Sequence, residues 1–184
     1  SVSTGNEAVC GVEDYLEYVL EEPSVKVVTM IVEQFRQPTR FLALARRARA
    51  LGKPIVLLHP GRSSAARDSA ATHTGAMVGD YAAMRALVSR AGVILVDSLE
   101  ELLDVTDIAS RCGADFKTGC GVLTESGAFK ALTLDLCEQV GLALTPINAA
   151  VNAGMRAVLP DFIPVSNPMD LTAQALVDPE LYKR

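Results

Sequence analysis

Two kinds of apolar spacing alternate along the first part of the chain. Apolar residues at every third or fourth position predict helices over residues 12–22, 38–51, 81–90 and 98–110. Short runs rich in β-branched residues predict buried strands over residues 25–32, 55–58 and 93–96. Strands and helices that alternate in this order favour a parallel sheet with helices on its faces, so the pattern predicts an α/β fold.

The periodicity is lost after residue 110 and then returns. Residues 111–119 carry two glycines and mixed charges without a period, and we interpret residues 113–119 as a linker. Beyond it we expect a strand over 120–124, a helix to about Val140, a strand over 142–147, a helix over 148–159 and a turn at 167–170. The chain therefore divides into a unit of residues 1–112, the linker, and a second unit of residues 120–184.

Residues 61–79 follow neither apolar period. They are mostly Gly, Ala, Ser and Thr, which leave backbone N–H groups uncovered, and they carry His73 within Thr-His-Thr-Gly. A surface histidine without a role is one interpretation. The other is a functional histidine, because the segment follows a predicted strand, and ligands bind at the carboxyl ends of parallel strands. We expect residues 27–32 and 53–58 to be adjacent parallel strands, which would bring Glu33 to the same edge.

A second candidate site begins the helix that follows residues 120–124. Ser126, Gly127 and Ala128 form a strand-to-helix turn, and helix N-termini bind anions through free N–H groups and the helix dipole. Serine and glycine also cap helices for structural reasons alone, so this signal is weaker than that of His73.

Composition and charge narrow the class of protein. Hydrophobic residues make up 49% of the chain, aromatic residues 5%, and tryptophan is absent, so the core must be aliphatic, as in parallel sheets. The net charge is −5 and no basic stripe occurs, which argues against nucleic-acid binding. Acidic residues gather in 12–22 and basic ones in 38–51, which we interpret as two solvated helix faces.

The cysteines and the hydropathy indicate a compartment. The four cysteines form no CxxC motif and have no metal-ligand spacing, so we expect free thiols in a reducing cytosol and no metal site. No apolar run reaches the roughly 20 residues of a membrane helix, and no signal peptide opens the chain. We expect a cytoplasmic protein that binds no membrane.

Short motifs along the whole chain match one family in order: STGNE at 3–7, VE at 32–33, KP at 53–54, GRS at 61–63, AATHTGA at 70–76, AGVILV at 91–96, ELLD at 101–104, TESGA at 124–128 and NPMD at 167–170. With them the chain resembles the NDP-forming acyl-CoA synthetases, the superfamily of succinyl-CoA synthetase and ADP-forming acetyl-CoA synthetase. The HTG element with its upstream GRS is the specific part. The resemblance implies a flavodoxin-like three-layer α/β/α fold in two consecutive units, truncated at both ends.

The resemblance also implies roles for single residues. His73 would be the phosphohistidine that carries a phosphoryl group between nucleotide and carboxylic acid, and Glu33 would orient it. This agrees with chemistry, since a carboxylate on one ring nitrogen leaves the other neutral and nucleophilic. Ser126, Gly127 and Ala128, with Thr74 and Gly75, would hold the phosphate.

Cofactors and partners follow from the same resemblance. The implied enzyme is a ligase that forms or cleaves acyl-CoA, with no bound cofactor except a transient phosphate on His73. CoA and ATP or ADP with Mg²⁺ would be used through other parts: a CoA-binding domain and an ATP-grasp domain or subunit. An oligomer is expected, and the isolated chain is expected to be inactive. One departure from the family is His59-Pro60, which stands where a lysine and a small residue are more common.

Two other functions remain open at this point. One is a non-catalytic CoA-synthetase-like regulatory or binding module, for example in a protein acetyltransferase, although such a module would need neither His73 nor Glu33. The other is a plain flavodoxin-like receiver or nucleotide binder, but neither GxGxxG nor GxxxxGK[ST] occurs. The sequence does not name the acid or choose between ATP and GTP.

Overall fold

The computed structural model describes residues 1–66, 80–112 and 119–183. The chain divides into two compact units, Ser1–Phe116 and Lys117–Arg184, and each is described by itself. The linker predicted at residues 113–119 lies almost wholly outside the described residues. The linker and the domain boundaries therefore stay predictions.

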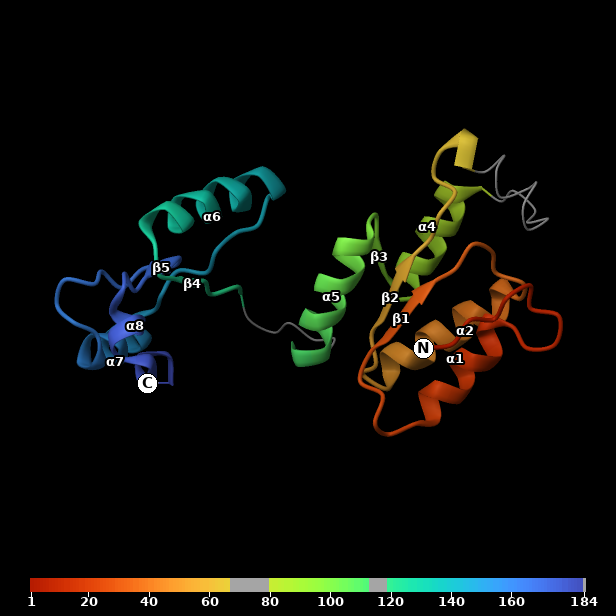
Figure 1. Ribbon diagram of the computed structural model, residues 1–184, viewed down its shortest axis with the longest axis horizontal. Helices are drawn as coiled ribbons and strands as arrows, with labels where there is room; N and C mark the ends of the chain where they lie inside the picture. Colours follow the sequence, from red (N-terminus) through yellow and green to blue (C-terminus); the bar gives the residue numbers. More distant parts are fainter. Residues whose placement is uncertain (67–79, 113–118, 184) are drawn as a thin grey trace. The chain divides into compact units, whose positions relative to one another are not determined.

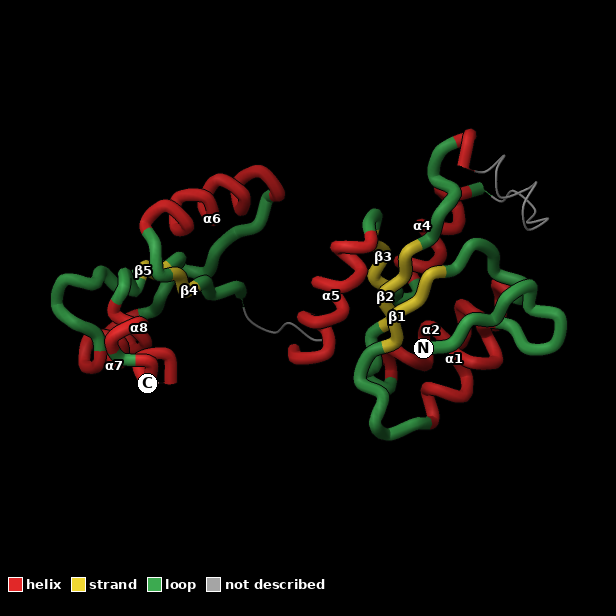
Figure 2. Tube along the Cα trace, in the orientation of Figure 1, coloured by secondary structure: helices red, strands yellow, loops and turns green. Residues whose placement is uncertain are grey.

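The first unit is built on three parallel strands. They are β1 (Val28–Ile31), β2 (Ile55–Leu58) and β3 (Ile94–Val96), in the order β1-β2-β3. Leu58 pairs with Ile31 on one side and with Val96 on the other, so all three strands end at the same level. Figure 2 shows the strands side by side between helices. The prediction of adjacent parallel strands with their carboxyl ends at one edge is confirmed.

Helices cover both faces of this sheet. On one face lie α1 (Val12–Glu21), α2 (Pro38–Ala50) and α4 (Tyr81–Arg90), and on the other lies α5 (Leu99–Cys112). Residues of β2 alternate between the faces: Ile55 and Leu57 join the first cluster, while Val56 joins the cluster under α5. Helix, sheet and helix form three layers, as the sequence predicts (Figure 1).

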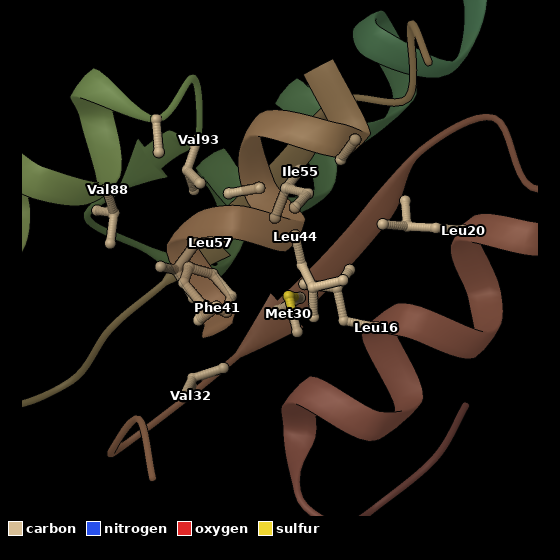
Figure 3. Packing of buried hydrophobic residues seen from close by; sticks show 13 residues of the cluster. Leu16, Leu20, Met30, Val32, Phe41, Leu44, Ile55, Leu57, Val88 and Val93 are labelled. Carbon is tan, nitrogen blue, oxygen red and sulfur yellow. The ribbon is translucent and has the colours of Figure 1, made fainter. Parts of the chain in front are cut away.

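The core is aliphatic around one aromatic residue. Figure 3 shows Leu16 of α1 and Leu44 of α2 directed toward Met30 of β1, with Phe41 beside them. Leu16 and Phe41 are each 1% exposed. Full burial of a side chain of this size stabilises the fold by about 1.5–3 kcal/mol, so these contacts dock α1 and α2 on the sheet.

The charged residues of α1 and α2 pair with one another. Arg40 binds Asp14 at 2.7 Å and Glu17 at 2.5 Å, and Arg47 binds Glu21. The paired side chains are 33% to 63% exposed, so the interpretation as solvated helix faces holds for them, whereas Glu13 is buried. The acidic and basic rows face each other across the contact between the helices, which the shared apolar contacts of α1 and α2 bring together.

Side chains cap two helices of this unit at their N-termini. Asp80 Oδ1 accepts hydrogen bonds from the N–H groups of Ala82 at 2.9 Å and Ala83 at 3.2 Å, as expected of an N-cap. At α5, Ser98 Oγ accepts from the N–H of Glu101 at 3.1 Å. The Glu101 carboxylate, however, accepts from the N–H of Asp97 at 2.7 Å rather than from that of Ser98.

The second unit has a smaller parallel pair of strands, β4 (Leu123–Thr124) and β5 (Met169–Asp170). Its helices are α6 (Gly127–Val140), α7 (Ala149–Val158), α8 (Gln174–Val177) and the 3₁₀ helix η1 (Pro179–Lys183). A small core of five buried residues holds it together: Leu159, Ile163, Met169, Leu171 and Leu181. The predicted helices 127–140 and 148–159 are confirmed.

Two predictions in this unit are wrong for one reason. Residues 142–147 form no strand, and the expected turn at 167–170 contains β5 instead. The Asn167 side chain donates to the carbonyls of Cys120 at 2.7 Å and Thr145 at 2.9 Å, and accepts from the N–H of Val122 at 3.0 Å. The Asn167 side chain thus occupies the carbonyl of Thr145, within residues 142–147, and its bond with Val122 aligns Met169 beside β4.

Candidate functional site

The carboxyl edge of the first sheet collects three titratable residues. Glu33 comes two residues after β1, His59 directly follows β2, and Asp97 directly follows β3. They reach one edge because the three strands end in register. Figure 1 shows the chain leaving β2 at this edge toward residues 61–66. The edge predicted from the sequence therefore carries an ionisable residue from each of the three strands.

The segment that carries Glu33 is fastened to the N-terminal part of the chain. Arg36 forms an ion pair with Glu7 at 3.4 Å and donates to the carbonyl of Asn6. The N–H of Gln37 donates to Glu13 Oε1 at 3.1 Å. These contacts fix residues 36 and 37, three and four residues beyond Glu33. Glu33 itself is exposed, so its carboxylate is accessible to a neighbouring group.

A cavity of about 680 Å³ lies beside Glu33. It is lined by residues 1–7, by Tyr15 and Leu16 of α1, and by β1 with Glu33 and Gln34. Its volume falls within the range of small-molecule pockets, about 300–1,000 Å³. The STGNE motif thus forms part of the cavity wall.

His59 belongs to a row of aromatic rings at the same edge. Its ring lies nearly parallel to Phe35, with centroids 5.8 Å apart, and 5.9 Å from Tyr81. Nδ1 is buried without a hydrogen-bond partner among the described residues. Burial lowers the pKa of His59, and a hydrogen bond with the backbone of Val32 raises it by less. The imidazole is therefore neutral at neutral pH. Sequence reasoning noted His59 only as a departure; its place directly after a buried strand was the available signal.

Asp97 binds two arginines, one from each side of residues 67–79. Its Oδ2 lies 3.6 Å from Arg62, in the GRS motif, and its Oδ1 accepts from Arg85 of α4 at 3.1 Å. Sequence reasoning did not single out Asp97 or Arg85, because the pairing depends on the register of β2 and β3.

The residues around the expected phosphohistidine lie outside the described part of the chain. His73, Thr74 and Gly75 all fall within residues 67–79. Their roles stay predictions, as does that of Glu33 toward His73.

The other expected phosphate-binding group lies in the second unit. Ser126 is the N-cap of α6 and makes no side-chain capping bond, and Gly127 and Ala128 begin the helix. The first N–H groups of a helix have no intrahelical partner, so this turn retains donors for an anion. Asp170 Oδ2 lies 3.5 Å from where a Cβ on Gly127 would stand, which places one carboxylate near the same turn. The phosphate-binding role of Ser126, Gly127 and Ala128 stays a prediction.

Two further observations concern the described residues alone. They contain no group of three or more His, Cys, Asp or Glu side chains arranged to hold a metal ion. None of their helices is long and apolar enough to span a bilayer.

Comparisons with known proteins agree on one family. The family model described as "Succinyl-CoA ligase like flavodoxin domain" matches residues 1–109. A trans-feruloyl-CoA synthase from an unknown prokaryotic organism is 53% identical over 100% of this chain, which covers 26% of that protein. An ADP-forming acetate–CoA ligase of Methanocaldococcus jannaschii is 31% identical over 95% of this chain, which covers 24% of that protein. This chain thus spans about a quarter of the length of these relatives.

A solved structure extends the likeness to both units. The dinucleotide-forming acetyl-coenzyme A synthetase 1 of Ca. Korarchaeum cryptofilum, in complex with phosphate and ADP, superposes with a TM-score of 0.80 at 25% identity. The match covers 95% of this chain and 38% of that one. The α/β fold of this chain is therefore that of a flavodoxin-like part of an acyl-CoA synthetase.

Proposed function

The chain belongs to the family of succinyl-CoA ligase like flavodoxin domains, and from this membership we propose that it is the phosphohistidine-bearing part of an NDP-forming acyl-CoA synthetase. In this proposal a nitrogen of His73 attacks the terminal phosphoryl group of a nucleoside triphosphate, and the diphosphate leaves. The phosphoryl group then passes from His73 to the carboxylate of an acid, which gives an acyl phosphate. The thiol of CoA displaces phosphate from that species and forms the thioester.

The observation that carries the proposal is the common edge of β1 and β2. Ile31 of β1 pairs with Leu58 of β2. The chain therefore leaves β1 toward Glu33, and leaves β2 toward His73, at the same level of the sheet. A carboxylate there can accept a hydrogen bond from one ring nitrogen of His73. The other nitrogen then keeps its lone pair for attack on phosphorus.

The turn at the start of α6 supplies a second group. Its free N–H donors, contributed by Ser126, Gly127 and Ala128, would hold the phosphoryl group together with Thr74 and Gly75. Charge stabilisation by fixed donors suits phosphoryl transfer, in which most of the catalysis comes from positioning and electrostatics.

The remaining parts of the reaction would come from elsewhere in a larger synthetase. A CoA-binding domain and an ATP-grasp domain or subunit would supply CoA, nucleotide and Mg²⁺, and we propose a cytoplasmic oligomer. The short span of this chain relative to its relatives supports this division. The 53% identity to a feruloyl-CoA synthase, against 31% to an acetate ligase, favours an aromatic acid over acetate as substrate.

The test is to locate the phosphoryl group. A synthetase that contains this chain is incubated with ATP labelled in the terminal phosphate, and the label is mapped by trypsin digestion. Trypsin cleaves after arginine, so His59 and His73 fall in different peptides, separated by Arg62 and Arg67. We expect acid-labile label in the peptide of residues 68–85 and none after H73N, which cannot form the N–P bond. Label that persists in H73N overturns the proposal and leaves the family assignment as a statement about fold.

A further inference from the structure

The described segments on either side of residues 67–79 bind one shared carboxylate, that of Asp97. Arg62 lies before residues 67–79 and Arg85 after them, and each binds a different oxygen of Asp97. The distances are 3.6 Å from Arg62 to Oδ2 and 3.1 Å from Arg85 to Oδ1. Asp97 therefore connects two parts of the chain that are 23 positions apart in sequence (62 to 85).

The carboxylate of Asp97 is held in place from its own side. Asp97 follows β3 directly, and its N–H donates to Glu101 Oε2 at 2.7 Å. The next residue, Ser98, caps α5 by accepting from the N–H of Glu101 at 3.1 Å. The backbone of Asp97 is thus fixed between the end of β3 and the first turn of α5.

The arginines are also in defined places. Arg62 is four residues beyond the end of β2, and Asp97 directly follows β3. Because Leu58 of β2 pairs with Val96 of β3, the chain leaves these two strands at neighbouring positions. Arg85 lies on α4, where it also forms a hydrogen bond with the Tyr81 side chain. Tyr81 in turn packs against His59 at the end of β2.

Global stability does not explain this arrangement. The side chains of Arg62, Arg85 and Asp97 are 73%, 45% and 42% exposed, and exposed ion pairs add little to the free energy of unfolding. A shared anion can nevertheless restrict the separation of two chain ends and so reduce the conformations open to the residues between them.

We propose that Asp97 is a positioning residue for phosphoryl transfer, which binds Arg62 and Arg85 and thereby fixes both ends of the segment that carries His73. The inference rests on the proposed function, because the group to be positioned is the His73 imidazole. Asp97 acts through the two arginines and does not itself contact the phosphoryl group. Small displacements of a reacting group can slow a reaction by as much as about a hundredfold, so the effect should appear in rate rather than in folding.

The main test compares D97N with D107N in a synthetase that contains this chain. Asp107 is the matched control because it is an aspartate of the same unit whose exposed ion pair, with Arg111 at 3.0 Å, lies within α5. We expect D97N to slow single-turnover phosphorylation of His73 by about tenfold to a hundredfold, with unchanged nucleotide affinity and thermal midpoint. D107N should match the wild-type protein in all three measurements.

Further variants separate positioning from a structural role. D97E keeps the charge and should recover most of the rate. R62M and R85M should each slow phosphorylation, and D97N should add little to the double variant R62M/R85M, because the three residues form one unit. A wild-type rate in D97N overturns the inference. So does an equal loss in D97E together with a lowered midpoint, since the role would then be structural. Label that persists in H73N instead rejects the proposed function, and with it this inference.

Discussion

Glu13 at the start of α1 accepts a hydrogen bond from the N–H of Gln37, at 3.1 Å, and so joins two helix N-termini. Gln37 is the N-cap of α2 and has no side-chain cap of its own. Glu13 is 0% exposed, and its second oxygen, Oε2, has no partner among the described residues. A buried carboxylate therefore serves as the external cap of α2 and fixes the end of the segment that begins with Glu33.

This contact predicts different effects for two substitutions of Glu13. E13Q keeps the side-chain oxygen that accepts from the N–H of Gln37. It replaces the other oxygen, which has no partner among the described residues, by an amide NH₂ group. We therefore expect the thermal midpoint of unfolding to stay or rise. E13A leaves the N–H of Gln37 unpaired. We expect E13A to be less stable than E13Q by about 1–3 kcal/mol, the cost of a buried donor without a partner.

Urea denaturation of the two variants checks this prediction. E138Q is the control, because Glu138 is an exposed glutamate of α6 in the other unit and its neutralisation should change little. Equal stability of E13Q and E13A would mean that water replaces Glu13 at the α2 N-terminus.

The pKa of His59 makes stability depend on pH. Burial lowers this pKa below the ordinary value of 6.5, so in acid the unfolded chain binds a proton before the folded protein does. The contribution of His59 to stability is present above about pH 6.5 and is lost as the pH falls toward the lowered folded value. H59F keeps a ring beside Phe35 and Tyr81 but does not titrate.

We therefore expect the thermal midpoint of H59F, relative to wild type, to rise as the pH is lowered from about 7.5 to about 5.5. Differential scanning calorimetry at several pH values measures this difference. A constant difference across the range would show that the folded protein protonates His59 as readily as the unfolded chain does.

Local signals account for the parts of the fold that the sequence predicts well. Strand β2 is found at the predicted residues because its apolar run lies between Lys53-Pro54 and His59-Pro60, which limit it on both sides. Helix α4 begins where Asp80 caps it. In each case the residues that decide the structure are sequence neighbours.

The wrong predictions depend on contacts between distant residues. Met169 and Asp170 pair with Leu123 and Thr124 because the Asn167 side chain holds them there, and no periodicity in residues 167–170 reveals this. The same limit applies to the site. Strand ends sufficed to place Glu33 at the carboxyl edge, whereas the contacts of Asp97 with Arg62 and Arg85 follow from the register of β2 and β3.

The last prediction concerns Glu33 as the residue that orients His73. Glutamine at this position keeps the size and one acceptor oxygen but lacks the charge. Without the carboxylate, the ring nitrogen that attacks phosphorus is no longer kept free of its proton by a fixed partner. Loss of such an orienting partner typically reduces activity by about ten- to a hundredfold. In a synthetase that contains this chain, we expect E33Q to slow phosphorylation of His73 by this amount. The exposed position of Glu33 means that the thermal midpoint should be unchanged.

The matched control is E100Q, which removes a negative charge near the carboxyl edge of the same sheet and leaves β1 and Glu33 unchanged. Glu100 is an exposed acid in the first turn of α5, which starts just beyond the carboxyl end of β3. E100Q should therefore phosphorylate at the wild-type rate if Glu33 acts by contact with His73. If E100Q is slowed as much as E33Q, the effect is the general negative potential of the edge rather than orientation of one imidazole. A wild-type rate in E33Q would remove Glu33 from the mechanism while leaving His73 as the carrier, because the two roles are measured by separate variants.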